Sequence, residues 1–372
     1  MKRLVLGALA ACIAAGTFIT AQEVTPFKVG TFERQGTRPF VGVVLRDTYV
    51  IDLAAAAAAT KASNVQAPSD MKDLIARYDS GVRSLIVAVV KAAGDPARAG
   101  RPAYIHEVKA IKTLPPIMYP TTILNAAVNY YAHAAEGQAL APAAPGAVKP
   151  GYADAKTVSA PGLWERQPGD ERWNPYFFLK AQAAIIANGE TIRIPPGRTR
   201  IDWECEMGIV IGRTANHVPI DRARDYVFGY TLEMDVSDRG GRGDTRMGGS
   251  DWLIGKSHDT FAPMGPFIVP KEFIPDPMKL KITYTLDSQV MQDANTSEAI
   301  HNVNEMVSFG TNIITLRPGD VIAFGSPDGV GAARKPPIFL KAGQTSVCTY
   351  EGIGTLTNPI GAAVSTTNSA SR

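Results

Sequence analysis

DWECEMGIVIGR, residues 202–213, is the stretch that decides the fold of this chain. It is short, becomes β-branched toward its end and stops at Gly212, which predicts a β-strand. Side chains alternate across a strand, so Glu204 and Glu206 should point to one face. The opposite face is apolar and consists of Trp203, Cys205, Met207, Ile209 and Ile211.

Two carboxylates side by side are the chemical feature of this strand. They repel each other and are costly to bury, and a divalent cation removes both costs. A second strand-like run, residues 229–239 (GYTLEMDVSDR), would supply Asp235 as a third ligand. An all-carboxylate set favours a hard ion, Mg²⁺ or Mn²⁺, over zinc. Spacing alone favours a surface strand with two solvated glutamates, so the metal hypothesis depends on the rest of the chain.

Five further motifs accompany these two runs. They are NYYAHAAE at 129–136, FLK at 178–180, GKSHDTFAPMGP at 255–266, PGDVIAFGSPDGVG at 318–331 and GIGTLTN at 352–358. In this order the set closely resembles the fumarylacetoacetate hydrolase family, from about residue 123 to 360. The resemblance implies an α+β fold that is mainly β, with a rolled mixed β-sheet catalytic domain and a small N-terminal α/β domain. It also implies one Mg²⁺ or Mn²⁺ per chain and a homodimer.

His133 and Glu136 form a candidate general base. They are three residues apart, which on a helical turn places them within hydrogen-bonding reach. A carboxylate raises the basicity of a neighbouring imidazole and orients it to take a proton from water. The spacing alone favours an ordinary pair on a helix surface. Within its motif, however, the pair resembles the catalytic dyad of the family.

Three more side chains are candidates for contact with a substrate. The ammonium group of Lys256 would neutralise charge that develops on a bound carbonyl oxygen. The forked donors of Arg239 would suit a substrate carboxylate. The alternatives without a functional role are that Lys256 is a solvated loop residue and that Arg239 forms an ordinary ion pair. Ser326 stands where the family commonly has threonine, so a hydroxyl for substrate contact is kept.

The chain also departs from the family pattern next to Arg239. The family continues with an acidic residue and then, two residues later, a glutamine, where this chain has Gly240 and Arg242. Asp238 replaces the usual small residue. These changes leave the metal ligands intact and alter the substrate pocket. A second arginine, Arg242, indicates a more anionic substrate or one of a different shape.

The N-terminus has the layout of a secretory signal peptide. Lys2 and Arg3 precede an uncharged stretch that ends near Ala21, which predicts cleavage there and export to the periplasm or the medium. Two alternatives remain, a lipoprotein anchored through Cys12 and an uncleaved membrane anchor.

The domain boundary is expected in the proline-bearing crossover at 109–119. This gives a small domain at 22–117 and a catalytic domain at 118–362. Within them the patterns predict an antiparallel sheet over 27–53, one amphipathic helix over 71–93 and another near 300–315. The Ala-, Pro- and Gly-rich stretch 137–175 is expected to be a long loop. The tail 363–372 is expected to be disordered.

Composition limits the functional classes. A 45% hydrophobic and 20% charged chain builds a real core, and a net charge of +3 gives no support for nucleic-acid binding. Only Cys12, Cys205 and Cys348 occur, so disulfides are not expected to stabilise the fold. The chain has no Gly-x-Ser-x-Gly elbow and no His-Glu-x-x-His helix. Residues 329–331 lack the third glycine of a dinucleotide site.

The leading hypothesis is a metal-dependent hydrolase that cleaves a carbon–carbon bond in a β-dicarbonyl, acylpyruvate-like acid. The His133–Glu136 pair would activate water, and the ion would stabilise the leaving enolate. The family resemblance leaves open a decarboxylase, a dehydratase or an isomerase of 2-oxo acids. An exported metal-containing binding protein without turnover is the third hypothesis.

Overall fold

A twelve-stranded sheet carries both strands of the predicted metal site in the computed structural model, which describes residues 24–140, 160, 162–165, 167–170, 172–242 and 251–362. Ten strands form its main path, in the spatial order β4 (Ile105–Glu107), β3 (Tyr49–Asp52), β2 (Phe40–Leu45), β1 (Lys28–Glu33), β14 (Ala262–Pro270), β12 (Val227–Met234), β11 (Cys205–Ile211), β17 (Val321–Ala323), β6 (Ile123–Ala127) and β7 (Tyr176–Leu179). Two short strands pair beside this path, β5 (Lys112–Thr113) with β1 and β8 (Ile185–Ile186) with β14. Most pairs are antiparallel, but β17 with β6 and β14 with β8 are parallel, so the sheet is mixed.

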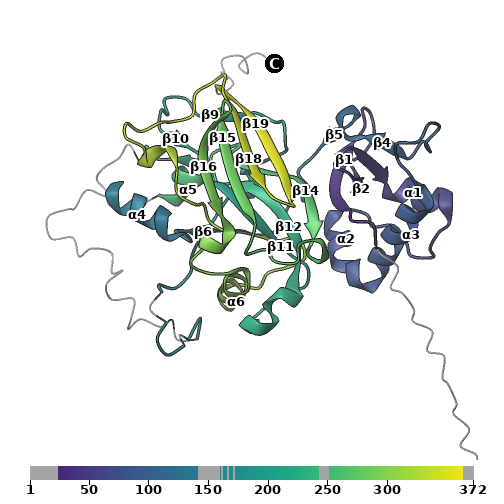
Figure 1. The fold of residues 1–372 in the computed structure, drawn as a ribbon, viewed down its shortest axis with the longest axis horizontal. Helices are drawn as coiled ribbons and strands as arrows, with labels where there is room; N and C mark the ends of the chain where they lie inside the picture. Colours follow the sequence, from purple (N-terminus) through teal and green to yellow (C-terminus); the bar gives the residue numbers. More distant parts are fainter. Residues whose placement is uncertain are drawn as a thin grey trace, which may run out of the picture.

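A second sheet packs against the centre of the first. Its strands are β16 (Gln289–Asn295), β15 (Lys281–Leu286), β18 (Thr345–Tyr350), β19 (Gly354–Ala362) and β9 (Ile192–Ile194). Figure 1 shows β15, β16, β18 and β19 beside β11 and β12, and a large apolar core lies between the two sheets. A two-stranded ladder, β10 (Ile201–Asp202) with β13 (Ser237–Asp238), completes the strands of the described residues. The expected mainly β, α+β fold is confirmed.

The alternation predicted for residues 202–213 is confirmed, although the strand is shorter than expected. Strand β10 ends at Asp202 and β11 begins at Cys205, so residues 203 and 204 belong to neither strand. Met207 and Ile209 belong to the core between the sheets, whereas Val210 faces the core of the N-terminal elements. Because side chains alternate along a strand, the burial of Met207 in one core places Glu204 and Glu206 on the opposite face.

The N-terminal elements gather on one side of the molecule (Figure 1). Strands β1, β2 and β3 form the expected antiparallel sheet, but β1 also pairs with β14, so this sheet continues into the metal strands. Helix α1 (Leu53–Thr60) packs on it. The prediction of one helix over 71–93 is wrong, because α2 (Met71–Arg77) and α3 (Arg83–Ala93) are separated by a kink at Gly81. The φ of +134° at Gly81 lies in a region that glycine adopts most readily.

Three helices accompany the strands of the predicted site. Helix α4 (Tyr131–Leu140) carries His133 and Glu136, and α5 (Trp252–Lys256) ends on Lys256. Helix α6 (Val303–Ile313) matches the helix predicted near 300–315. Asn302 caps α6, since its side chain accepts a hydrogen bond from the Glu305 amide while the Glu305 carboxylate accepts one from the Asn302 amide.

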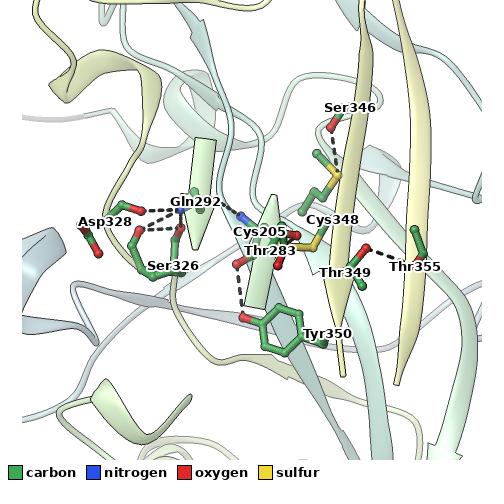
Figure 2. Close-up of a disulfide and its surroundings, with 12 residues drawn as sticks. Cys205, Thr283, Gln292, Ser326, Asp328, Ser346, Cys348, Thr349, Tyr350 and Thr355 are labelled. Atoms are coloured by element: carbon green, nitrogen blue, oxygen red, sulfur yellow. Dashed lines mark hydrogen bonds between the residues drawn. A yellow bond between two sulfur atoms is a disulfide. The ribbon is translucent and has the colours of Figure 1, made fainter. Parts of the chain in front are cut away.

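The expectation that no disulfide stabilises the fold is wrong. Cys205 on β11 and Cys348 on β18 form a disulfide with a Cα–Cα distance of 5.5 Å, which joins the two sheets (Figure 2). Both residues are fully buried. They are 143 residues apart in sequence, and only the packing of one sheet on the other brings them together.

Several expectations concern residues outside the described ones. This group includes the signal peptide at 1–21 with Cys12, the tail at 363–372, and residues 141–159 of the stretch 137–175 that was expected to be a loop. Helix α4 extends to Leu140, so the start of that loop was placed too early. The domain boundary at 117 stays a prediction. Across the part of the chain that the structure describes, helices are too short or too polar to cross a bilayer.

Candidate active site

The pairing of β11 with β12 brings the three predicted metal ligands together. In the register Cys205 lies opposite Met234, and the Asp235 amide donates to the Glu204 carbonyl just beyond the strand ends. Glu204, Glu206 and Asp235 are at most 4% exposed. Each offers a carboxylate oxygen, and these oxygens lie within 4.8 Å of one another. The sequence-predicted set is therefore one compact group of hard donors.

The electrostatics of this group fit a divalent cation. Burial raises the pKa of Glu206 well above its usual value, and the neighbouring Asp235 raises it further. Burial also raises the pKa of Asp235, although Lys180 and Lys256 oppose this rise. The Oε2 atom of Glu206 accepts a hydrogen bond from the Gly325 amide at 2.7 Å. A divalent cation bound between these carboxylates would offset the mutual repulsion that contributes to their raised pKa values.

Among the three predicted ligands, Glu204 has the most cationic surroundings. Its Oε2 accepts a hydrogen bond from Lys256 at 2.6 Å, and its Oε1 accepts one from Arg239 at 2.5 Å. Burial acts to raise the pKa of Glu204, but Lys256 and Arg239 hold it well below its usual value. This carboxylate is therefore ionised and held in a fixed orientation.

The predicted His133–Glu136 pair lies beside Glu204. The Nδ1 atom of His133 is 3.3 Å from Glu136 Oε2, and its Nε2 atom is 3.6 Å from Glu204 Oε1. Burial acts to lower the pKa of His133, but Glu136 and Glu204 raise it to about 9. The Gly329 amide donates to Glu136 Oε1 at 2.9 Å and fixes the orienting carboxylate. The pair thus adjoins the metal ligands and does not lie on a free helix surface.

Lys256 does not stand free for a substrate carbonyl. Its ammonium group donates to both Glu204 and Asp235 and lies 5.0 Å from the centroid of the Phe178 ring. A second buried lysine, Lys180, donates to Asp235 and to the Val236 carbonyl. No chemical role was predicted for the motif 178–180, but Lys180 lies beside the predicted metal ligand Asp235.

The predicted substrate-binding residues fall into two neighbouring cavities. Two of the predicted metal ligands, Glu204 and Glu206, line a cavity of about 80 Å³ together with His133, Arg239, Lys256 and Ser326. Arg242 lines a second cavity, of about 270 Å³, and donates to Asp251 at 2.8 Å. Arg239, Trp252 and Lys256 line both cavities. Arg239 is engaged with Asp202 and Glu204, so it faces the site as part of an ion-pair network.

One segment, residues 325–329, contacts both a predicted metal ligand and the His133–Glu136 pair. The Gly325 amide binds Glu206, the Gly329 amide binds Glu136, and Ser326 lines the metal cavity. Gln292 fixes this segment, since its Nε2 atom donates to Ser326 Oγ and to the carbonyls of residues 327 and 328 (Figure 2). Its Oε1 atom accepts a hydrogen bond from the Cys205 amide at 3.2 Å, between two metal ligands.

Sequence reasoning missed two residues of this region. Glu233 is fully buried and lies opposite Glu206 in the strand register. Glu233 could have been predicted from strand alternation, because it lies two residues before Asp235 and therefore on the same face. Burial and the neighbouring Asp235 raise the pKa of Glu233 to about 8, against the effect of Lys180. Gln292 comes from the second sheet, and no local pattern indicates its contact with Ser326.

Several curated proteins with similar sequences are oxaloacetate tautomerases by name. The chain is 38% identical over 188 residues to the mitochondrial oxaloacetate tautomerase Fahd2a of Rattus norvegicus, covering 50% of this chain and 59% of that protein. It is 41% identical over 181 residues to a putative hydrolase of Burkholderia ambifaria, covering 48% of this chain and 63% of that protein. The chain thus spans about three fifths of the length of these relatives.

Solved structures resemble 71–91% of the chain. Maleylpyruvate hydrolase from Sphingobium sp. SYK-6 has a TM-score of 0.64 and 26% identity, covering 90% of this chain and 100% of that one. A structure of that hydrolase with manganese(II) ion and pyruvate has a TM-score of 0.64 and 25% identity, covering 91% of this chain and 100% of that one. The 5-carboxymethyl-2-hydroxymuconate delta-isomerase from Mycobacterium smegmatis has a TM-score of 0.54 and 32% identity, covering 71% of this chain and 87% of that one.

These relatives correct the predicted location. The prediction of export to the periplasm or the medium is wrong, because similar curated proteins at 37–39% identity are mitochondrial enzymes by name. The prediction of a signal peptide was made from the charged start and the apolar stretch of residues 1–21. That pattern identifies a signal peptide by composition alone.

The family assignment rests on the match of the catalytic region as a whole. The model of the fumarylacetoacetate (FAA) hydrolase C-terminal domain matches residues 122–361. This range includes both strands of the predicted metal site, the His133–Glu136 pair and the segment 325–329. The chain belongs to the fumarylacetoacetate hydrolase family.

Proposed function

We propose that this chain is a divalent-metal-dependent hydrolase that cleaves a carbon–carbon bond in an acylpyruvate-like acid. The observation that supports it best is the position of His133 between Glu136 and the ligand Glu204. A base that adjoins a metal ligand is placed to deliver water to a substrate held at the ion. Glu204, Glu206 and Asp235 would hold the ion, Mg²⁺ or Mn²⁺. The bound ion would supply Lewis-acid polarisation of the substrate oxygens.

The two nitrogens of His133 have separate tasks in this proposal. Nδ1 faces Glu136, which keeps a proton on that atom. Nε2 points toward Glu204 at 3.6 Å. A cation held by Glu204 would offset the charge that raises the pKa of His133, so Nε2 would be free to accept the proton of the attacking water. The Gly329 amide holds Glu136 in place, so the imidazole keeps one orientation through the reaction.

Cationic side chains around the cavity support a small anionic substrate. Lys256 and Arg239 line the metal cavity and would contact the substrate oxygens, with Ser326 as a neutral hydrogen-bonding group. Arg242 lines the adjoining cavity and would contact the far end of a longer acid. Lys256 would stabilise developing negative charge by moving between a carboxylate and the substrate oxygen. A homodimer, which the family resemblance implies, also stays a prediction.

A second candidate is an isomerase or tautomerase of 2-oxo acids on the same site. The named relatives include oxaloacetate tautomerases and a delta-isomerase, which favours this reading. Such a reaction needs proton transfer but no attacking water. The decarboxylase and dehydratase alternatives share the same requirement for a stabilised enolate.

Turnover by protein loaded with Mg²⁺ or Mn²⁺ tests the proposal. A panel of acylpyruvates should be hydrolysed to pyruvate and a second acid, measured by chromatography of the products. Enol–keto conversion of oxaloacetate should be measured on the same samples. Conversion of oxaloacetate without hydrolysis of any acylpyruvate would replace the hydrolase by the tautomerase. No turnover of either class, with intact metal binding, would favour a binding protein.

A further inference from the structure

Glu233 is a fourth carboxylate on the face that carries the predicted metal ligands. It precedes Asp235 by two residues and lies opposite Glu206 in the pairing of β12 with β11. Alternation along a strand places Glu233 on the side of Asp235. The three-ligand set does not include it, because the compact group of oxygens consists of Glu204, Glu206 and Asp235.

The hydrogen bonding of Glu233 is incomplete. Its Oε2 atom accepts a hydrogen bond from Asn125 Nδ2 at 3.2 Å, whereas its Oε1 atom has no partner among the described residues. Glu233 and Asn125 are both fully buried. A buried carboxylate with one unpaired oxygen is costly to keep unless something nearby compensates its charge.

Lys180 and Lys256 compensate this charge only at a distance, since neither donates a hydrogen bond to the unpaired Oε1 atom of Glu233. Lys180 donates to Asp235, and Lys256 donates to Glu204 and Asp235. When the four carboxylates are ionised, the two ammonium groups leave a formal charge of −2. The ion pair of Arg239 with Asp202 adds no net charge. With one divalent cation bound, this set would sum to zero, whereas a glutamine at position 233 would leave a charge of +1.

We propose that Glu233 sets the affinity of this centre for a divalent cation through its charge, without being one of the three ligands. Residues just outside a ligand set tune metal affinity in this way. The inference rests on the metal centre of the proposed function, but it is independent of the reaction that the centre catalyses. Glu233 is thus a positioning residue for the ion.

Calorimetric titration of the full chain with MnCl₂, after removal of bound metal by a chelator, tests this role. Glu233→Gln keeps the shape and removes the charge, and it should weaken Mn²⁺ binding by about 10–100-fold. Glu233→Asp keeps the charge and should retain most of the affinity. Glu305→Gln is the matched control, because it neutralises another buried carboxylate, on α6, that binds Arg172 and Asn302. It should bind Mn²⁺ like the wild type.

Thermal unfolding with and without Mn²⁺ gives a second measurement. The metal-induced gain in melting temperature should be smaller in Glu233→Gln than in the wild type. Equal affinities of wild type and Glu233→Gln would overturn the inference, as would an equal loss in Glu233→Asp. A Gln variant that unfolds while the Asp variant folds would assign the residue to the fold instead. A wild type that binds no Mn²⁺ would refute the metal centre itself, and with it the proposed function.

Discussion

Removal of the Cys205–Cys348 disulfide should cost the protein a large part of its stability. The bond closes a loop with a sequence separation of 143 residues. The chain-entropy relation assigns about 5 kcal/mol to a loop of that length, and real proteins deliver somewhat less. The double variant in which both cysteines become alanine should therefore lose roughly 3–5 kcal/mol of unfolding free energy. Urea denaturation in non-reducing buffer measures this loss.

A thiol titration must precede the denaturation experiment. Denatured protein that has not been reduced should show one free thiol per chain, that of Cys12, and three after reduction. Cys12→Ala keeps both bonded cysteines and is the matched control for cysteine removal. Three free thiols before reduction would show that the bond does not form. A double variant as stable as the wild type, with the bond present in the wild type, would refute the entropic reasoning.

Three further predictions concern the site and its surroundings. Simultaneous replacement of Glu204, Glu206 and Asp235 by alanine should abolish Mn²⁺ binding in calorimetry, and unchanged binding would place the ion elsewhere. His133→Ala should lower acylpyruvate hydrolysis by about 10²–10⁴-fold and leave Mn²⁺ affinity intact; near-normal hydrolysis would exclude it as the base. Burial acts to raise the pKa of Glu305, but hydrogen bonds from neighbouring groups lower it to about 2. Its stabilisation, roughly 3 kcal/mol, should be complete above pH 4.5 and vanish as the pH falls toward 2. Glu305→Gln should flatten this pH dependence of the urea midpoint, and an unchanged profile would contradict the assignment.

Local sequence patterns were sufficient for much of the fold and the site. Period-two alternation placed Glu204 and Glu206 on the face opposite Met207, because a strand has only two faces. Helix periodicity located α6, whose cap at Asn302 is also a local feature. The prediction of one helix over 71–93 was wrong at Gly81. The apolar periodicity continues through this position, whereas the backbone there leaves the helical conformation.

Long-range contacts were not accessible in the same way. The Cys205–Cys348 pairing and the contact of Gln292 with Ser326 both depend on how the second sheet packs on the first. No spacing in the sequence encodes that packing. Arg242 was expected at the substrate, and the structure places it in a neighbouring cavity on Asp251. Its role in binding an acid stays a prediction.

The segment 325–329 makes the parts of the site energetically dependent on one another. Glu206 and Glu136 are bound to amides only four residues apart in this segment. A cation that fixes Glu206 would therefore restrict the backbone that also orients Glu136. By thermodynamic reciprocity, anything that immobilises Glu136, such as a substrate against His133, would tighten the hold on the cation by the same factor. Metal and substrate should then bind with positive cooperativity, carried by five residues of backbone.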